Sequence, residues 1–257
     1  MVRASAKNHA FVGVVTDPGQ YPKVLADLRE SGALSDTTRK ELALAAFRRT
    51  AAYDAQIVDW LAEQVEGPDA VDAETAAQLP ETIEITLSRQ QVLRYGENPH
   101  QVGARYATRA SSLGGIGGWW DTATQHGGKE MSYLNVYDAD AAWRLAYSLG
   151  DQPAAAVIKH ANPCGVAVAD DILTAYTKAH ECDPVSALGG IVAVNRPVTL
   201  AMAEALAPVF TEVLIAPGYE PDALVKLLEK RNLRVLEAAP PSPLVPTLRT
   251  VDGGYLV

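Results

Sequence analysis

The sequence predicts an α/β protein with a layered α/β/α arrangement, in which helices cover both faces of a sheet. Short apolar runs alternate with longer helix-like stretches along the second part of the chain. The 257 residues, 48% hydrophobic and 21% charged, are enough for one large or two modest domains. An acidic, alanine-rich segment bracketed by Pro68 and Pro80 indicates a linker over 67–81, between regions 1–66 and 82–257.

The first region predicts a strand followed by two helices. Residues 9–16 are apolar and favour a buried strand. A helix is expected over 19–31, after Asp17-Pro18 and before Gly32. Ser35 or Asp36 then caps a long helix, because apolar residues recur there at intervals of three and four.

The region after the linker predicts alternating strands and helices. Alternation of apolar residues from Ile83 indicates its first strand. The expected helices are 138–148, 172–181, 200–206 and 221–230, and the expected strands 155–158, 191–194, 212–215 and 233–236. Ligands gather beyond the carboxyl ends of strands in open α/β sheets. Lys159 and His160 follow strand 155–158 and are therefore expected where a substrate can reach them.

Composition excludes several classes of protein. No segment approaches the roughly 20 apolar residues of a membrane span, and the start is too broken for a signal peptide. The chain has two cysteines, Cys164 and Cys182, which are too few for a disulfide framework and favour reduced thiols in the cytoplasm. A net charge of −9 disfavours nonspecific binding to nucleic acid, although a local basic pocket for one phosphate remains compatible with it.

The stretch "VIKHANPCGVA" places Lys159 and His160 directly before a turn. A neighbouring ammonium disfavours the imidazolium form, so His160 is expected to stay neutral and to act as a general base. Lys159 could stabilise an oxyanion, Asn162 could orient either group, and Pro163 stiffens the turn. On the residues alone, a surface lysine, a packed histidine and a plain turn are the favoured explanation, and the position at a strand end narrows the difference without removing it.

A zinc deaminase is the rival interpretation of this stretch. Such enzymes combine His-x-Glu with a later Pro-Cys-x-x-Cys. Pro163 and Cys164 supply the first part, but Ala167 stands where the second cysteine is needed, and Cys182 is too distant in the sequence. The "HAN" segment also lacks the glutamate. We therefore predict no metal.

Other segments combine residues that suit a nucleotide. In "LRYGENPHQ", Arg94 offers a fork for phosphate or carboxylate, and Tyr95 offers a ring and a hydroxyl. Asn135 could hydrogen-bond a sugar or an amide. Gly189 precedes a strand where a ligand could approach the backbone, and Glu212 opens another strand. Taken singly, each residue is at least as well explained by turns and ion pairs of the fold, and Gly189 and Glu212 more often belong to the architecture than to a site.

Taken together, the motifs resemble one family. "LRYGENPHQ", "LNVYDADAAW", "VIKHANPCGVA", "DPVSALGGIVAVN", "EVLIAPGYE" and "KRNLRVL" follow the order seen in the bifunctional enzymes that join AICAR formyltransferase to IMP cyclohydrolase. The resemblance implies that 1–66 is the C-terminal part of a methylglyoxal-synthase-like cyclohydrolase domain. It also implies that 82–257 is the N-terminal half of a cytidine-deaminase-like transformylase domain without zinc ligands.

The resemblance implies an activity and roles for individual residues. The family transfers a formyl group from 10-formyltetrahydrofolate to the 5-amino group of AICAR and then closes the product to IMP. His160 and Lys159 match the base and its supporting lysine, and Lys7 matches a lysine of the cyclohydrolase site. The positions that match the nucleotide site are Arg94, Tyr95, Asn135, Gly189 and Glu212.

The resemblance also sets expectations for the assembly. The family forms homodimers, and its complete members are longer than this chain, so we expect an internal piece that binds nucleotide weakly and turns over poorly. The alternative is a truncated, non-catalytic module that binds purine nucleotides. No nucleic-acid or membrane partner is expected.

Overall fold

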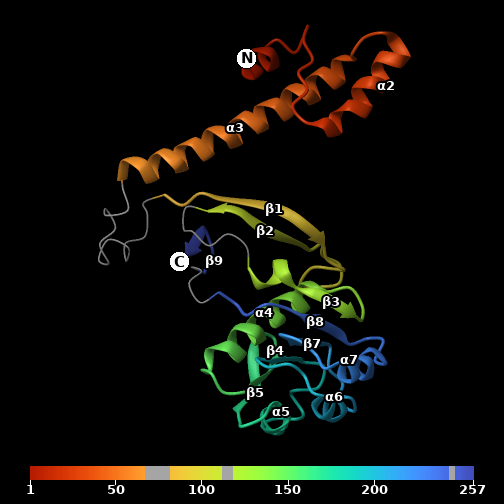
Figure 1. Ribbon diagram of the computed structural model, residues 1–257, viewed down its shortest axis with the longest axis vertical. Coiled ribbons are helices and arrows are strands. Elements are labelled where there is room, and N and C mark those ends of the chain that lie inside the picture. The colour runs from red at the N-terminus through yellow and green to blue at the C-terminus, as the bar shows by residue number, and fades with distance from the viewer. Residues whose placement is uncertain (67–81, 112–117, 243–246) are drawn as a thin grey trace. The chain divides into compact units, whose positions relative to one another are not determined.

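The computed structural model describes residues 1–66, 82–111, 118–242 and 247–257 (Figure 1). The chain divides into two compact units, Met1–Leu79 and Pro80–Val257. We refer to them as the first unit and the second unit and describe each by itself. The predicted linker 67–81 lies outside the described residues.

The first unit is helical. Its elements are α1 (Val2–Lys7), the short 3-10 helix η1 (Pro18–Gln20), α2 (Tyr21–Ser31) and α3 (Asp36–Glu66). Asp17 caps η1, and Gly32 ends α2 with a left-handed φ of 72°. The hydroxyl of Ser35 accepts a hydrogen bond from the backbone N–H of Thr38, so Ser35 caps α3. Both predicted helices of this region are confirmed.

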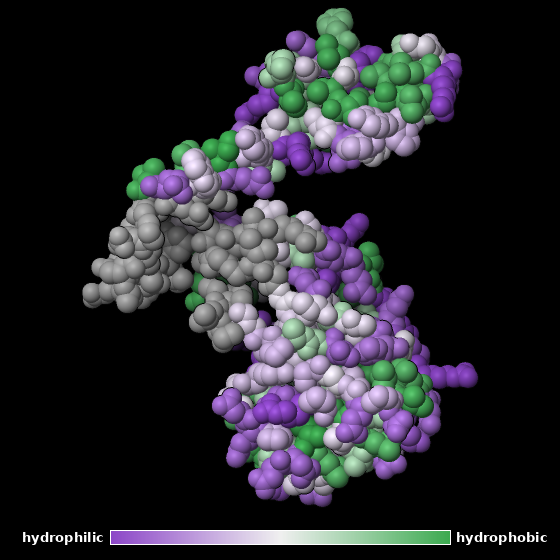
Figure 2. All heavy atoms as spheres, viewed as in Figure 1, coloured by the Kyte–Doolittle hydropathy of each residue, from purple (hydrophilic) through white to green (hydrophobic). Residues whose placement is uncertain are grey.

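The strand predicted over 9–16 is wrong. These residues form turns and irregular backbone, and the side chain of Phe11 is 90% exposed. A strand needs a partner for its backbone groups, and the described residues of the first unit contain no other strand. The buried cluster of this unit is small, consisting of Ala6, Ala43 and Ala46, and Figure 2 shows hydrophobic side chains at its surface.

The second unit is built on a six-stranded mixed sheet with the order β3-β8-β7-β6-β4-β5. The strands are β3 (Thr124–Gly127), β4 (Ala154–Lys159), β5 (Asn162–Val168), β6 (Ile191–Val194), β7 (Val213–Ala216) and β8 (Arg234–Glu237). Strands β6, β7 and β8 are parallel, whereas β4 runs antiparallel to both β5 and β6. Strand β3 is antiparallel to β8.

Helices cover both faces of this sheet, so the predicted α/β/α layering is confirmed (Figure 1). One face packs against α4 (Tyr133–Ser148), and the other against α5 (Ile172–Glu181), α6 (Leu200–Leu206) and α7 (Pro221–Leu228). Alternate residues of β4 and β6 enter the two cores, as the two-residue period of a strand requires. Ala155 and Val157 belong to one core, and Ala156 and Ile158 to the other.

Smaller elements complete the second unit. An antiparallel pair consists of β1 (Ile85–Val92) and β2 (Ala104–Ser111), and a second pair of β9 (Arg249–Val251) and β10 (Gly254–Leu256). The 3-10 helix η2 (Trp119–Thr122) precedes β3 and places Trp119 in the core beside α4.

Two departures from the sequence prediction matter for the site. Helix α4 begins at Tyr133 and not at Asp138, because Ser132 and Asn135 form a reciprocal capping box. The segment after His160 is a strand, β5, where we expected only a turn. Its Pro163 and Gly165 weaken strand propensity but are tolerated because β5 lies at the edge of the sheet.

Candidate active site

The predicted site residues of the second unit gather around the end of β4 and the start of α4. Because β4 runs against β6, its carboxyl end lies at the amino ends of the parallel strands β6, β7 and β8: Ile158 pairs with Ile191, Ile191 with Val213, and Val213 with Arg234. Lys159 and His160 follow the carboxyl end of a strand, as expected. Glu212 precedes β7, so the cluster forms at the opposite ends of the parallel strands from those that the general rule indicates.

A two-residue turn joins β4 to β5 and carries His160. Lys159 pairs with Asn162, and both intervening residues are left-handed, with φ of 54° at His160 and 55° at Ala161. Tight hairpin turns with two left-handed residues favour Asn-Gly because other side chains are strained there. The imidazole of His160 is exposed at the tip of this hairpin.

The carboxylate of Asp138 holds this turn. It accepts hydrogen bonds from the backbone N–H of His160 at 3.2 Å and of Ala161 at 2.8 Å. Burial raises the pKa of Asp138, while the two amide hydrogen bonds act in the opposite direction. The side-chain amide of Asn162 donates to the carbonyl of His160 at 2.8 Å, so the turn is bound from both sides.

Asn135 and Glu212, predicted separately from distant segments, are in direct contact. Nδ2 of Asn135 donates to Oε2 of Glu212 at 2.7 Å, and Nη1 of Arg234 lies 3.5 Å from the same oxygen. Arg234 is 5% exposed and also donates to the carbonyl of Glu130. Burial lowers the pKa of Arg234, and the charge of Glu212 opposes that shift. The result is a carboxylate with one amide donor and one guanidinium neighbour.

Arg94 and Tyr95 are attached to the start of α4. The N–H of Arg94 donates to the carbonyl of Met131 at 3.2 Å, and the N–H of Tyr133 donates to the carbonyl of Tyr95 at 3.3 Å. The guanidinium of Arg94 lies 5.5 Å from the centre of the Tyr95 ring. Both side chains are close enough to Arg234 to act on its pKa, Tyr95 raising it and Arg94 lowering it. The charge of Arg234 is paired with Glu212, so the exposed guanidinium of Arg94 is the cation that remains for an anionic ligand here.

Lys159 and Gly189 meet at the loop before β6. Nζ of Lys159 donates to the carbonyl of Leu188 at 2.9 Å. Gly189 has a φ of 75°, and a Cβ there would approach the Phe210 ring to 3.2 Å. The observed role of Gly189 is thus to shape the loop that holds the ammonium group of Lys159.

A solvent-open hollow of about 410 Å³ lies beside the hairpin. It is lined by Lys159, His160, Asn162, Pro163, Cys164, Asp183 and Ser186. Burial raises the pKa of the Cys164 thiol, so the thiol stays neutral and contributes little nucleophilicity. The hollow therefore presents an ammonium, an imidazole and a carboxylate to solvent.

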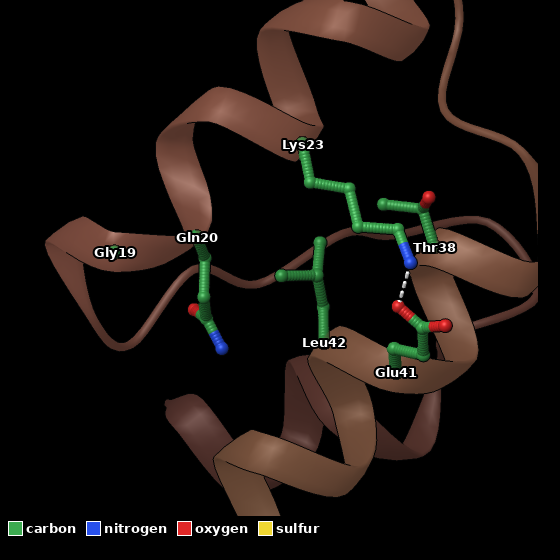
Figure 3. Close-up of a pocket in the computed structure, with 6 residues that line it drawn as sticks. All are labelled: Gly19, Gln20, Lys23, Thr38, Glu41 and Leu42. Atoms are coloured by element: carbon green, nitrogen blue, oxygen red, sulfur yellow. Dashed lines mark hydrogen bonds and ion pairs between the residues drawn. The ribbon is translucent and has the colours of Figure 1, made fainter.

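Lys7 lies in the first unit, at the end of α1, and its side chain is exposed. A hollow of about 190 Å³ in this unit is lined by Gly19, Gln20, Lys23, Thr38, Glu41 and Leu42 (Figure 3). Lys7 does not line it. Lys23 is paired with Glu41, and the side-chain oxygen of Gln20 accepts hydrogen bonds from the backbone N–H groups of Thr16 and Asp17. These polar groups are already bonded within the fold.

Two residues of the site were missed from the sequence, Asp138 and Arg234. The signal for Asp138 was its spacing of three from Asn135, which places both on one helix face. It was overlooked because the helix was expected to start at Asp138 itself. Arg234 lies in the motif "KRNLRVL", but nothing local in that motif distinguishes it from a basic residue that merely opens a strand. Its role follows from the pairing of β8 with β7, which brings it beside Glu212.

In the described part of the chain, no three side chains of His, Cys, Asp or Glu come together as a metal site. Within the same ranges, no helix has both the length and the apolar character that crossing a membrane requires. Cys164 and Cys182 are free thiols.

The mixed sheet with helices on both faces, and a polar cluster at the ends of its strands, place the second unit in the α/β class of proteins. Residues 5–257 match the family model of the AICARFT/IMPCHase bienzyme. The chain belongs to this family.

Two curated relatives show the same relationship. The bifunctional purine biosynthesis protein PurH of Corynebacterium glutamicum (strain ATCC 13032) is 46% identical over 258 residues, which cover 100% of this chain and 47% of the relative. PurH of Mycobacterium ulcerans (strain Agy99) has the same identity and coverage. The chain thus spans about half the length of the curated relatives it matches.

Proposed function

We propose that the second unit takes part in formyl transfer from 10-formyltetrahydrofolate to the 5-amino group of AICAR. The first unit, with Lys7, would contribute to the cyclisation that yields IMP. The observation that carries the proposal is the contact between Asn135 and Glu212, which lie 77 residues apart. Asn135 is on α4, the helix whose Asp138 holds the His160 turn. Family membership and the activities named for the relatives support it.

Formyl transfer to this amine requires a base for the amine proton and a cation for the oxyanion of the intermediate. The amine of AICAR is conjugated with its carboxamide and is a poor nucleophile, so it must lose a proton as it attacks the formyl carbon. In this proposal His160, which is exposed and lines the hollow, accepts that proton. Lys159 uses one of its three N–H groups on Leu188, which leaves two for the oxyanion of the tetrahedral intermediate.

Binding of the nucleotide falls to the cluster at the start of α4. The exposed guanidinium of Arg94 suits the phosphate, because it offers two parallel donors to one anion. Glu212 is held by Asn135 and Arg234, and its remaining lone pairs can accept hydrogen bonds from ribose hydroxyls or the carboxamide. In this proposal Asn135 and Glu212 act as a pair.

A second candidate is a nucleotide-binding module without catalysis. It is favoured by the span of the chain, which is about half that of its relatives. A homodimer and a cytoplasmic location belong to both proposals. The family resemblance favours the homodimer, and the free thiols favour the cytoplasmic location.

Titration calorimetry with AICAR and an assay for tetrahydrofolate release test the proposal on this chain. We expect Asn135→Ala to weaken AICAR binding at least about tenfold, as loss of a hydrogen bond to a charged group does. His160→Ala should keep the affinity within a few fold and abolish any formyl transfer. His180→Ala is the matched control, because His180 lies on α5 and does not line the hollow.

The outcomes separate the candidates. AICAR binding with turnover that depends on His160 supports the transferase. Binding that depends on Asn135 without turnover supports the binding module. If AICAR does not bind, or if His160→Ala retains turnover, the assignment of these residues is wrong.

A further inference from the structure

We propose that Asp138 is a positioning residue, whose carboxylate holds the His160–Ala161 turn in its left-handed form and thereby places the imidazole of His160. The effect of Asp138 on catalysis rests on the proposed function. Its effect on the conformation of the His160–Ala161 turn does not, and that effect can be measured without an activity assay.

The turn has an energetic cost that something else in the fold must offset. Within the described ranges, His160 and Ala161 are the non-glycine residues with positive φ. A left-handed conformation is strained for an L-residue, because its Cβ comes too close to the following carbonyl oxygen. A glycine at the second position would avoid the cost, yet Ala161 stands there. The sequence therefore does not stabilise this turn by local preference.

The carboxylate of Asp138 supplies the compensation. Its two oxygens each accept one N–H, Oδ2 from His160 and Oδ1 from Ala161. Hydrogen bonds to an ionised acceptor are about twice as strong as those between neutral groups. Asp138 is only 7% exposed, so the two amides also satisfy a carboxylate that water reaches poorly. Each partner thus removes the cost of the other.

The helix that carries Asp138 links the turn to the nucleotide cluster. Asn135 precedes Asp138 by three residues on α4, so the two side chains share one face. Ala139, Ala142 and Trp143 of the same helix are fully buried against the sheet. Because α4 is fixed in this way, Asp138 sets the position of His160 relative to Asn135 and Glu212.

The alternative is that Asp138 is simply a satisfied buried polar group, with no particular effect on the turn. The two explanations differ in one respect. If Asp138 offsets backbone strain, relieving the part of that strain at residue 161 by Ala161→Gly must reduce the dependence on the carboxylate, because glycine adopts positive φ without steric cost. A general packing role is not affected by that glycine.

The experiment compares four forms of the chain: wild type, Asp138→Asn, Ala161→Gly and the double variant. Asparagine keeps the shape but replaces one acceptor oxygen by an NH₂ donor, so one turn amide loses its partner. Residue-resolved hydrogen exchange is measured at the amides of residues 160 and 161, and the imidazole signals of His160 are followed by NMR against pH.

We expect Asp138→Asn to lower protection of the two turn amides at least about tenfold and to shift the imidazole signals and their titration. Protection in β6 and β7 should stay within about twofold. In the double variant, the imidazole signals and their titration should return toward those of Ala161→Gly alone. Asp140→Asn is the matched control, because Asp140 lies on α4 but bonds Arg144 and Trp119.

Unchanged turn amides and imidazole signals in Asp138→Asn would overturn the inference. So would a loss that Ala161→Gly does not reduce, including the case in which Asp138→Asn unfolds and the double variant stays unfolded. Failure of AICAR to bind a chain with an intact turn bears on the proposed function alone.

Discussion

The two units of the chain differ sharply in what they bury. Among the described residues of the first unit, the buried apolar side chains are three alanines and Leu42, whereas Phe11 and Trp60 are largely exposed. The second unit buries whole strands of valine, isoleucine and leucine, together with Trp143. Hydrophobic stabilisation grows with the apolar area removed from water. The second unit therefore has a core that can sustain its own fold, and the first unit has little of one.

The comparison is tested most strongly by Gly165→Ala in the second unit. A Cβ at this position would lie 1.8 Å from the carbonyl oxygen of Ala179 and 2.8 Å from Cβ of Cys182, so α5 would have to move away from β5. We expect a loss of about 3 kcal/mol in the free energy of unfolding of this unit. Denaturant unfolding measures it, and hydrogen exchange shows which unit is affected.

Gly118→Ala is the control for this substitution, because a Cβ at Gly118 meets nothing within 4 Å. It should change stability by less than about 0.5 kcal/mol. Faster exchange throughout α2 and α3 in Gly165→Ala would show that the units do not unfold independently. It would contradict the conclusion that the core of the second unit sustains only its own fold.

Leu42→Ala probes the first unit. Leu42 is 4% exposed and is the largest buried aliphatic side chain among the described residues of this unit. Truncation should cost about 2 kcal/mol locally, which is the lower range for a core leucine because the cluster around it is small. Hydrogen exchange in α2 and in the first turns of α3 should become faster.

The strands of the second unit serve as the internal control for Leu42→Ala. Their amides should exchange at the wild-type rate. A matching loss of protection in β6 would mean that the first unit contributes to the stability of the second, contrary to the contrast in their cores.

Tyr176→Phe gives the smallest effect. The Tyr176 hydroxyl is buried and has no hydrogen-bond partner among the described residues, so its removal should change stability little at neutral pH. Burial raises the pKa of Tyr176 to about 12, whereas the ordinary value of a tyrosine is near 10. Above pH 10 the unfolded chain loses this proton while the folded chain keeps it, so stability falls as pH rises.

The phenylalanine variant lacks this loss. Near pH 11 it should be more stable than wild type by about 1 kcal/mol, relative to their difference at pH 7. Equilibrium unfolding at the two pH values measures the difference. Parallel pH profiles of the two proteins would show that the hydroxyl ionises in the folded state as easily as in water.

Sequence patterns predicted the elements that local chemistry determines. Helix α5 begins where Asp171 caps it, and α6 where Thr199 caps it, and both were predicted with their observed bounds. Strand β6 was predicted because four buried apolar residues stand in a row. The strand expected over 9–16 was wrong because a strand depends on a partner, which an apolar run by itself does not reveal.

The site was predictable only in part, because some of its contacts depend on the tertiary fold and not on local sequence. Lys159, His160, Asn135 and Glu212 belong to unusual motifs, and the structure brings the last two into contact. That contact, and the roles of Asp138 and Arg234, depend on which strands are neighbours in the sheet. Strand order is set by the tertiary fold, so no local pattern could have indicated that Arg234 faces Glu212.

The capping box at the start of α4 has a consequence for recognition. The amide of Asn135 accepts a hydrogen bond from the N–H of Ser132 and donates one to Glu212. An amide engaged at both ends cannot rotate by half a turn without breaking both bonds. Its polarity is thereby locked, and only one N–H and one lone pair remain for any molecule that arrives.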